Sequence, residues 1–255
     1  MPTVARFNVT PVKATALHHP DRLRFERFGV PGNREFFFVD EDGAKIAGTK
    51  LGTLQQIRSD FDAERDELSL RFPDGTVATG PAQGGEALDA RFSSRSVAVR
   101  LVPGPWNEPL SSYAGRPLRL ARVQHPGDAN DVRPVTLVSL ESVEELSRRG
   151  EREHPVDPGR FRMTIEVEGV SGPHEEDTWE GRHVRIGDVV LSLEGAVPRC
   201  VVTTLGPDTG LRDFPTLKVI KDYRGENEDG LPFGVYADVV EPGEARVGDP
   251  VELLT

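Results

Sequence analysis

The chain has 255 residues, of which 36% are hydrophobic and 29% are charged, a composition typical of a folded protein rather than a disordered one. Its formal net charge of -11 argues against non-specific nucleic acid binding, which depends on neutralising phosphates with Lys and Arg. Because no segment approaches the roughly 20 apolar residues of a membrane-spanning helix, and no secretion signal begins the chain, we expect a cytoplasmic protein with no membrane or nucleic acid partner.

Short β-branched or aromatic runs, bounded by turn residues, follow one another along the chain and have the length of strands. The predicted strands are 4–9, 36–40, 96–102, 118–123, 135–138, 164–167, 184–186, 189–193, 200–204 and 236–240. Helical signals are fewer: one short helix over 52–61, one that Ser139 caps and Gly150 ends, and one over 215–223. The pattern predicts a mostly β chain, a β-barrel or sandwich with a few short helices.

Two irregular stretches divide the chain. Residues 103–115 are rich in Pro, Gly and Ser, and residues 124–133 precede the helix that Ser139 caps. We therefore place a domain boundary near residue 130, with one domain over 1–130 and a second over 131–255. Residues 151–160 are expected to form a solvated loop.

The only cysteine is Cys200, so the chain excludes an internal disulfide and a zinc site built from several cysteines. A thiolate is a nucleophile and a soft metal ligand, and a neighbouring cation such as Arg199 favours that ionised form. Pro198 restricts the backbone before it, and the β-branched run after it predicts a strand. Taken alone, however, these local features favour a buried cysteine that acts as a small hydrophobic side chain.

A set of motifs in fixed order surrounds Cys200. They are Phe161-Arg162, Glu176 to Trp179, Ile186 to Asp188, Arg199 to Thr204, Asp208 to Gly210, Phe233 to Tyr236 and Val247 to Val251. With these motifs, residues from about 130 to 255 resemble the MOSC domain, the C-terminal domain of molybdenum cofactor sulfurase. The segments 10–13, 32–34 and 39–43 resemble the β-barrel domain that precedes it in the mitochondrial amidoxime reducing component and its bacterial relatives. The resemblance implies a MOSC β-barrel after an N-terminal β-barrel-like domain.

The resemblance also implies a molybdenum cofactor, Mo-molybdopterin, with Cys200 as the metal ligand and catalytic residue. The positions that match cofactor-binding residues of the family are Lys13, Arg34, Asp131, Arg133, Arg162, Thr164, Arg199 and Tyr236. The sequence departs from the family at Thr164, where asparagine is frequent, and at Ala14, where serine is frequent. Lys50 stands one position along from a family arginine that is absent here. These departures concern the substrate more than the cofactor.

The function that the resemblance implies is an oxidoreductase that reduces N-oxygenated small molecules such as hydroxylamines, amidoximes or N-oxides. A chain with one cysteine cannot build a four-cysteine iron–sulfur site. Electrons are therefore expected from separate ferredoxin- or flavin-type donor proteins. Two alternatives remain open: a sulfur-transfer or cofactor-handling module that carries a persulfide on Cys200, and a non-catalytic MOSC barrel. The leading interpretation predicts Cys200 at the floor of a basic cleft between the two domains, facing Lys13, Arg34 and Arg162.

Overall fold

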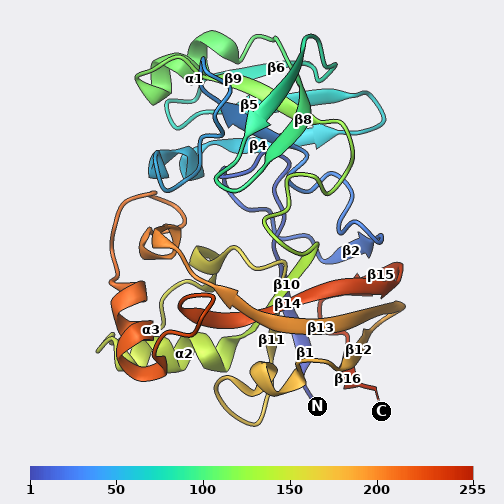
Figure 1. Cartoon of the computed structure of the whole chain (residues 1–255), viewed down its shortest axis with the longest axis vertical. Helices are drawn as coiled ribbons and strands as arrows, with labels where there is room; N and C mark the ends of the chain where they lie inside the picture. Colours follow the sequence, from blue (N-terminus) through green and yellow to red (C-terminus); the bar gives the residue numbers. More distant parts are fainter. Residues whose placement is uncertain (255) are drawn as a thin grey trace.

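The computed structural model describes residues 1–254 as two β lobes stacked along the longest axis of the molecule (Figure 1). The N-terminal lobe comprises the elements over residues 36–123. The C-terminal lobe comprises the strands over Thr3–Phe7 and Arg22–Phe25 and all elements from Val135 onward. Both ends of the chain lie at the far end of the C-terminal lobe (Figure 1). The prediction of a mostly β chain with a few short helices is confirmed.

A seven-stranded sheet forms the C-terminal lobe. In spatial order its strands are β1 (Thr3–Phe7), β11 (Ile165–Glu168), β10 (Val135–Ser139), β14 (Pro232–Glu241), β13 (Val189–Pro198), β12 (His183–Ile186) and β16 (Val251–Leu253). Only β10 and β11 run parallel. The Val4 amide donates to the Asp249 carbonyl at 2.9 Å, and the Val251 amide donates to the Pro2 carbonyl at 2.8 Å. These bonds join the two sheet edges, so the sheet is a nearly closed barrel with few free edge groups.

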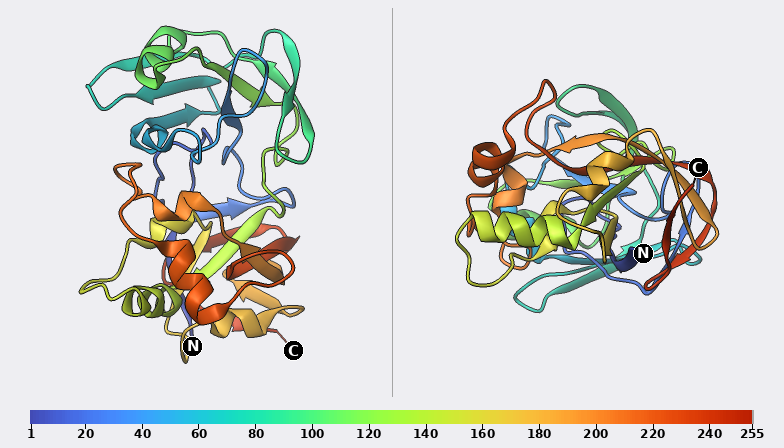
Figure 2. Two further views of the ribbon diagram at one scale, coloured as in Figure 1. Left: turned by 60° about the vertical axis from the view of Figure 1, so that its left-hand side comes forward. Right: turned by 90° about the horizontal axis from the view of Figure 1, so that it is seen from below.

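The inside of this barrel is filled by apolar side chains that include Phe7, Phe25 and Trp179, each at most 1% exposed. A separate ribbon, β2 (Arg22–Phe25) paired with β15 (Gly243–Arg246), continues this core. Helices α2 (Leu140–Arg149) and α3 (Thr216–Arg224) enclose a second apolar cluster with part of the sheet (Figure 2). The remaining elements are the 3-10 helices η2 (Pro158–Phe161), η3 (Glu175–Trp179) and η4 (Val201–Thr204).

The N-terminal lobe contains two smaller sheets. One has the order β3 (Phe36–Val39), β9 (Arg119–Val123), β8 (Ser96–Leu101) and β7 (Ala87–Arg91), and the other has β4 (Arg58–Asp62), β5 (Glu67–Arg71) and β6 (Val77–Pro81). The elements η1 (Gly52–Gln56) and α1 (Asn107–Ala114) complete the lobe. Side chains alternate along β3, so Phe36 and Phe38 enter one apolar cluster while Phe37 and Val39 enter another. This alternation explains why all four residues are buried.

Local signals located two of the three predicted helices. The Ser139 side chain accepts a hydrogen bond from the Ser142 amide at the start of α2, and Gly150 ends the helix, as predicted. The helix predicted over 215–223 is α3. The helix predicted over 52–61 is wrong beyond Gln56, because Ile57 is extended and β4 begins at Arg58.

Two further predictions are wrong in part. Residues 200–204 do not form a strand, because the Thr203 and Thr204 hydroxyls donate to carbonyls three residues earlier and favour the turn of η4. The loop predicted over 151–160 is exposed over residues 151–155 and at Asp157 but buried at its other end. Val156 is 3% exposed and Arg160 is 2% exposed, and the loop enters η2 at Pro158.

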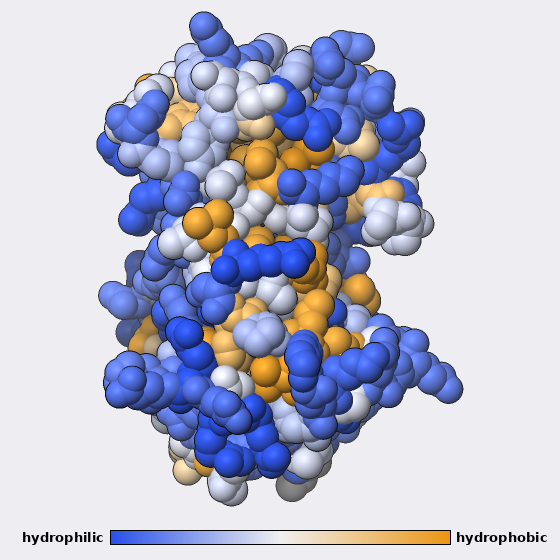
Figure 3. All heavy atoms as spheres, turned by 90° about the vertical axis from the view of Figure 1, so that its left-hand side faces the viewer, coloured by the Kyte–Doolittle hydropathy of each residue, from blue (hydrophilic) through white to orange (hydrophobic). Residues whose placement is uncertain are grey.

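The strand pairing crosses the predicted domain boundary near residue 130. Strands β1 and β2 come from the first 25 residues, yet they pair with β11 and β15 of the C-terminal lobe. The chain therefore passes between the lobes several times, and the crossing segments lie side by side at the junction (Figure 2). On the face shown in Figure 3, apolar residues gather at this junction while hydrophilic residues cover the two ends. Within residues 1–254, no helix has both the length and the apolar character needed to cross a membrane.

We expect a fragment of residues 131–255 to be unfolded, because it lacks β1, β2 and the barrel-filling Phe7 and Phe25. Both rings are 0% exposed in the chain, and removal of one such buried aromatic side chain alone costs about 3–5 kcal/mol. Far-UV circular dichroism and thermal unfolding test this expectation. The control joins residues 1–30 to 131–255 through a flexible linker and should recover a cooperative transition. A cooperative transition of the bare fragment would contradict the prediction.

Candidate functional site

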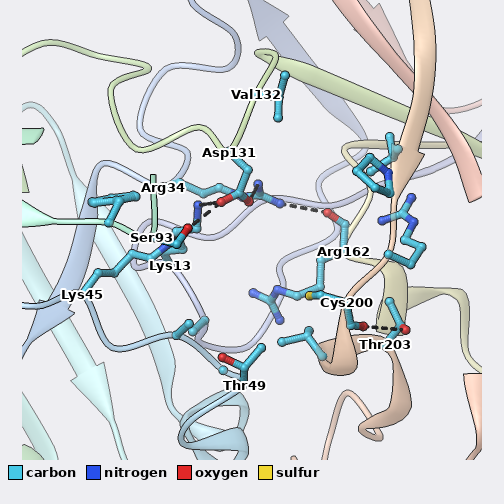
Figure 4. Close-up of a pocket in the computed structure, with 18 of the residues that line it drawn as sticks. Lys13, Arg34, Lys45, Thr49, Ser93, Asp131, Val132, Arg162, Cys200 and Thr203 are labelled. Atoms are coloured by element: carbon cyan, nitrogen blue, oxygen red, sulfur yellow. Dashed lines mark hydrogen bonds and ion pairs between the residues drawn. The ribbon is translucent and has the colours of Figure 1, made fainter. Parts of the chain in front are cut away.

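A cavity of about 670 Å³ lies at the junction of the lobes, within the range of small-molecule sites (Figure 4). The lining comes from segments far apart in the sequence: 13–14, 34, 44–50, 55, 91–93, 131–133, 136, 161–163, 197–200, 202–203 and 236. Several of these segments are the ones that connect the lobes. The cavity is therefore a product of the chain path rather than of either lobe alone.

Cys200 lies where β13 ends. Pro198 is the last residue of that strand, and the Arg199 amide still donates to the Leu231 carbonyl at 2.9 Å. The chain then turns into η4, where the Thr203 amide and hydroxyl both donate to the Cys200 carbonyl, at 3.1 and 3.0 Å. These bonds hold the cysteine outside the barrel core. Its thiol is exposed and lines the cavity, so the interpretation of a buried structural cysteine is wrong.

A cluster of cations surrounds one carboxylate on the side of the cavity away from Cys200 (Figure 4). The Lys13 ammonium donates to the Asp131 carboxylate and to the Ala129 carbonyl, both at 2.7 Å. Arg34 lies 3.7 Å and Lys45 lies 3.8 Å from the same carboxylate. Three positive charges thus meet one negative charge, and a second anion would improve the balance.

This crowding changes the acidity of the cluster. Burial is the largest influence on Lys13, and with Arg34 and Lys45 nearby it lowers the lysine pKa to about 7, although Asp131 opposes the change. Burial raises the pKa of Asp131, but Lys13, Arg34 and Lys45 outweigh it and bring that pKa to about 2. The carboxylate therefore stays ionised at neutral pH, while Lys13 exchanges its proton near neutral pH.

Arg162 lies on the Cys200 side of the cavity (Figure 4). Its guanidinium donates to the Thr15 carbonyl at 2.6 Å and approaches the Gln55 side-chain oxygen at 3.5 Å. Its own carbonyl accepts a hydrogen bond from Arg34 at 2.9 Å, which links the two sides of the site. Burial, and to a smaller extent the nearby Arg34, lower the Arg162 pKa to about 9, while Asp131 opposes the change.

Backbone conformation is unusual around this site. Six non-glycine residues in the described chain have positive φ, and three of them, Ala14, Arg34 and Arg162, line the cavity. Such conformations are disfavoured by about 1–3 kcal/mol each and persist only where surrounding contacts impose them. Their concentration here indicates a site whose side-chain positions matter more than local backbone stability.

Two other predicted site residues, Arg199 and Arg133, already have protein partners for their side chains. Arg199 lines the cavity, but its guanidinium donates to the Phe161 and Phe233 carbonyls, and burial lowers its pKa to about 10. Arg133 is paired with Asp238 and Glu194. These two arginines therefore stabilise the walls of the cavity.

Tyr236 and Thr164 lie on adjoining parts of the sheet. Tyr236 is half-buried on β14 and lines the cavity, and burial raises its pKa. Thr164 is 4% exposed and is not among the lining residues. Its hydroxyl lies 3.3 Å from that of Thr136, which lines the cavity in its place. The Thr164 side chain therefore contacts Thr136 of the neighbouring strand β10.

Sequence reasoning missed Lys45, Gln55 and Phe92. The Lys45 ammonium lies 4.1 Å from the centre of the Phe92 ring, a cation–π contact between the loop after β3 and the turn after β7. Gln55 lies on η1 and lines the cavity. None of the three belongs to a motif, and only the fold brings them to the site.

Charge at the cavity contrasts with charge on the whole chain. One acidic residue, Asp131, lines it against eight basic residues, in a chain of net charge -11. The basic residues are Lys13, Arg34, Lys45, Lys50, Arg91, Arg133, Arg162 and Arg199. The remaining lining is largely apolar and includes Ile46, Val197 and Val202. An anionic ligand with an apolar portion suits this arrangement.

Comparison with known proteins matches the MOSC domain model to residues 124–252, about half of the chain. The chain belongs to the MOSC domain family. Amidoxime-reducing component 1 of Xenopus laevis is 35% identical over 88% of this chain and 72% of that protein. The mouse component 1 is 40% identical over 49% of this chain, and the match spans only 38% of the mouse protein. The MOSC match contains Arg162, Cys200 and Tyr236, whereas Lys13 and Arg34 precede it.

Solved structures that match the chain include the YuaD protein of Bacillus subtilis. That chain has a TM-score of 0.47 and 15% sequence identity, with 99% of this chain and 96% of that chain covered. YiiM from Geobacillus stearothermophilus has a TM-score of 0.36 over 48% of this chain and 55% of that chain, at 20% identity.

The Lys13 pKa leads to a prediction for anion binding. Sulfate keeps its charge between pH 6 and 9, and it should bind to the cluster of Lys13, Arg34 and Lys45 more weakly as pH rises through about 7. Deprotonation of Lys13 removes one positive charge, while Asp131 stays ionised throughout this range. The affinity should fall by up to about tenfold per pH unit between the Lys13 pKa values of the empty and occupied states.

Isothermal titration calorimetry at low ionic strength measures this change. The matched control is Lys13→Arg, which stays charged and should show a nearly flat pH dependence. Equal slopes for the two proteins would show that Lys13 does not titrate in this range.

Proposed function

We propose that this MOSC protein is a molybdenum-cofactor-dependent oxidoreductase that reduces N-oxygenated compounds. The observation that carries the proposal is an exposed Cys200 thiol in a cavity whose other side gathers Lys13, Arg34 and Lys45. The similarity to amidoxime-reducing components supports a substrate with an N–O bond.

The donor set of the cavity fits the cofactor. Molybdopterin ends in a phosphate, which Lys13, Arg34 and Lys45 would hold, and Arg162 adds a guanidinium nearer the thiol. A thiolate suits a soft metal site, and the described residues hold no group of three His, Cys, Asp or Glu side chains around Cys200. Cys200 would thus be a single protein ligand, and the cofactor would bring the others. When bound, the cofactor supplies a metal that accepts oxygen and exchanges two electrons.

The residues of the chain would bind, orient and desolvate. The Cys200 thiolate would bind the metal of the cofactor, and Tyr236 on β14 would lie beside the bound pterin. Ile46, Val197 and Val202 line the cavity with apolar surface, which would exclude water and strengthen the polar contacts at the reacting end. Arg162 would present its guanidinium donors to the substrate or cofactor there.

The overall reaction has a simple balance. One N–O bond breaks, two electrons and two protons are taken up, and the oxygen leaves as water. The chain has one cysteine and no second redox centre of its own is proposed. The electrons would therefore come from a separate donor protein of the ferredoxin or flavin type.

Metal content tests the proposal most directly. Protein produced in a host that makes molybdopterin should carry stoichiometric molybdenum and a pterin, and it should reduce benzamidoxime with a chemical electron donor. Cys200→Ser should lower activity at least about 100-fold, because loss of a partner outside the ligand shell already costs roughly 10- to 100-fold. Its melting temperature should match that of the wild type, since the Cys200 side chain is exposed.

Other results would favour another function. A labile extra sulfur on Cys200 by mass spectrometry, without molybdenum, would support sulfur transfer. Equal metal content and activity in the wild type and in Cys200→Ser would rule out a role for the thiol.

A further inference from the structure

Two of the eight basic residues that line the cavity are not held by other groups of the protein. Of the others, three lie around Asp131, one is in an ion pair, and two donate to backbone carbonyls. Lys50 and Arg91 remain. Both are exposed, and neither side chain has an ion pair or a hydrogen bond within residues 1–254. A free cation on the wall of a cavity is available to an anionic group of a ligand.

The packing of the loop before η1 places Lys50 on the Cys200 side of the cavity. Two residues before it, Gly48 is buried, and a Cβ added there would lie 3.4 Å from the Val202 side chain. Two residues after it, a Cβ added to Gly52 would come 2.2 Å from a carbonyl oxygen of the loop after η4. Lys50 therefore lies between two contacts with the segment that follows Cys200.

The backbone of this loop is held in a turn. The Lys50 amide donates to the Ala47 carbonyl at 2.9 Å. Thr49 is exposed and also lines the cavity, and Figure 4 shows it on the Cys200 side, apart from Lys13. The rim of the cavity on this side thus carries an ammonium group and a neighbouring hydroxyl.

Arg91 belongs to the other half of the cavity. It is the last residue of β7, and its carbonyl accepts a hydrogen bond from the Lys45 amide at 2.9 Å. Lys45 is one of the cations near Asp131, where the phosphate of the cofactor would lie. Among residues 1–254, Lys50 is therefore the free cation of the Cys200 half.

The cavity wall next to Lys50 is apolar. Val202, against which the loop packs, and Ile46 of the same loop both line the cavity. Apolar surface favours the hydrocarbon part of a ligand, and a cation beside it favours an anionic substituent. A neutral ligand would make only the first of these two interactions.

We propose that Lys50 determines substrate specificity: it binds a carboxylate that the N-oxygenated substrate carries apart from its N–O group. This inference rests on the proposed function and adds an anionic substituent to its substrate class. The Thr49 hydroxyl can donate to the same carboxylate. The chain as a whole has a net charge of -11 and does not attract anions, so the preference must come from the local charge of the cavity.

Two substrates of nearly the same shape test the charge preference. One is 4-carboxybenzamidoxime, and its neutral reference is 4-carbamoylbenzamidoxime, in which an amide replaces the carboxylate. In both, the N–O bond breaks and an amidine and water form. Two protons come from solvent, and two electrons come from reduced methyl viologen, which replaces the donor protein. The ratio of the two kcat/KM values therefore measures recognition of the negative charge.

The molybdenum-loaded wild type should prefer the carboxylate compound. The ratio should fall about fivefold in Lys50→Met, because the substitution removes the charge and nearly keeps the length of the side chain. It should fall further in Lys50→Glu, which repels the carboxylate, and stay within about twofold of the wild type in Lys50→Arg. The loss should appear in KM rather than in kcat, since the carboxylate takes no part in the reaction.

Two matched controls separate Lys50 from positive charge in general. Lys218→Met removes the same charge from α3, where the side chain is exposed and does not line the cavity. Arg91→Met removes the other free cation of the cavity. The ratio should stay within about twofold of the wild type in both.

A binding measurement separates affinity from turnover. Without reductant no reaction proceeds, so calorimetric titration of the loaded protein with 4-carboxybenzamidoxime measures binding alone. The dissociation constant should rise about fivefold in Lys50→Met and stay unchanged in Lys218→Met. The difference between the wild type and Lys50→Met should shrink from about 0.1 M to about 1 M salt, because the screening length falls from about 10 Å to about 3 Å.

Each other outcome has a definite meaning. Activity toward both compounds, with the same ratio in the wild type, Lys50→Met and Lys50→Glu, would overturn the inference and leave the proposed function standing. A ratio that falls in Arg91→Met but not in Lys50→Met would also overturn it, as would loss of molybdenum from the Lys50 variants, which would assign the residue to the cofactor. Absence of activity toward both compounds in the loaded wild type would overturn the proposed function itself, and the inference with it.

Discussion

The hydrogen bonds that join β1 to β11, and the Val4 amide to Asp249, hold the start of the chain inside the C-terminal lobe. The chain leaves this lobe after β1, where Val12 pairs with Phe36, and again after β2; it builds the N-terminal lobe over residues 36–123 and then returns. The connecting segments therefore lie together at the junction, and they carry Lys13, Arg34 and Asp131. A barrel that kept all of its strands within one continuous stretch would place these residues on unrelated surfaces. The site depends on this early strand pairing more than on any contact within the cavity.

The junction between the lobes differs from the rest of the chain in its charge. The chain is acidic as a whole, yet the cavity gathers basic residues around a single carboxylate. Asp131 keeps these cations together by pairing with Lys13 and approaching Arg34 and Lys45. The compensation is partial, because burial lowers the Lys13 pKa despite the nearby carboxylate. Because Asp131 compensates only part of the positive charge, an anion that binds there makes favourable electrostatic interactions. A fully neutralised cluster would not offer them.

On the Cys200 side of the cavity, hydrogen bonds to backbone carbonyls hold the lining in place. Hydrogen bonds from the Thr203 amide and hydroxyl hold the loop, and Arg199 uses its guanidinium to fasten neighbouring carbonyls. These contacts hold the loop in a position that leaves Cys200 exposed. Arg162 lines the same side of the cavity, where its guanidinium donates to the Thr15 carbonyl. An exposed thiol on one side and a cluster of cations around Asp131 on the other divide the cavity into two chemically distinct halves.

Sequence alone determined the features that depend on short-range chemistry. The cap at Ser139, the stop at Gly150 and the strand predicted over 36–40 follow from local hydrogen bonding and residue preference, and the motif around Cys200 identified the family resemblance. Where a threonine hydroxyl competes with strand pairing, as at Thr203, local pattern was misleading. The neighbours of Cys200 were beyond sequence reasoning: Lys45 and Gln55 carry no motif, and their approach is set by how the lobes pack. Only the tertiary structure decides such contacts, because a pocket between lobes depends on distances that no local preference encodes.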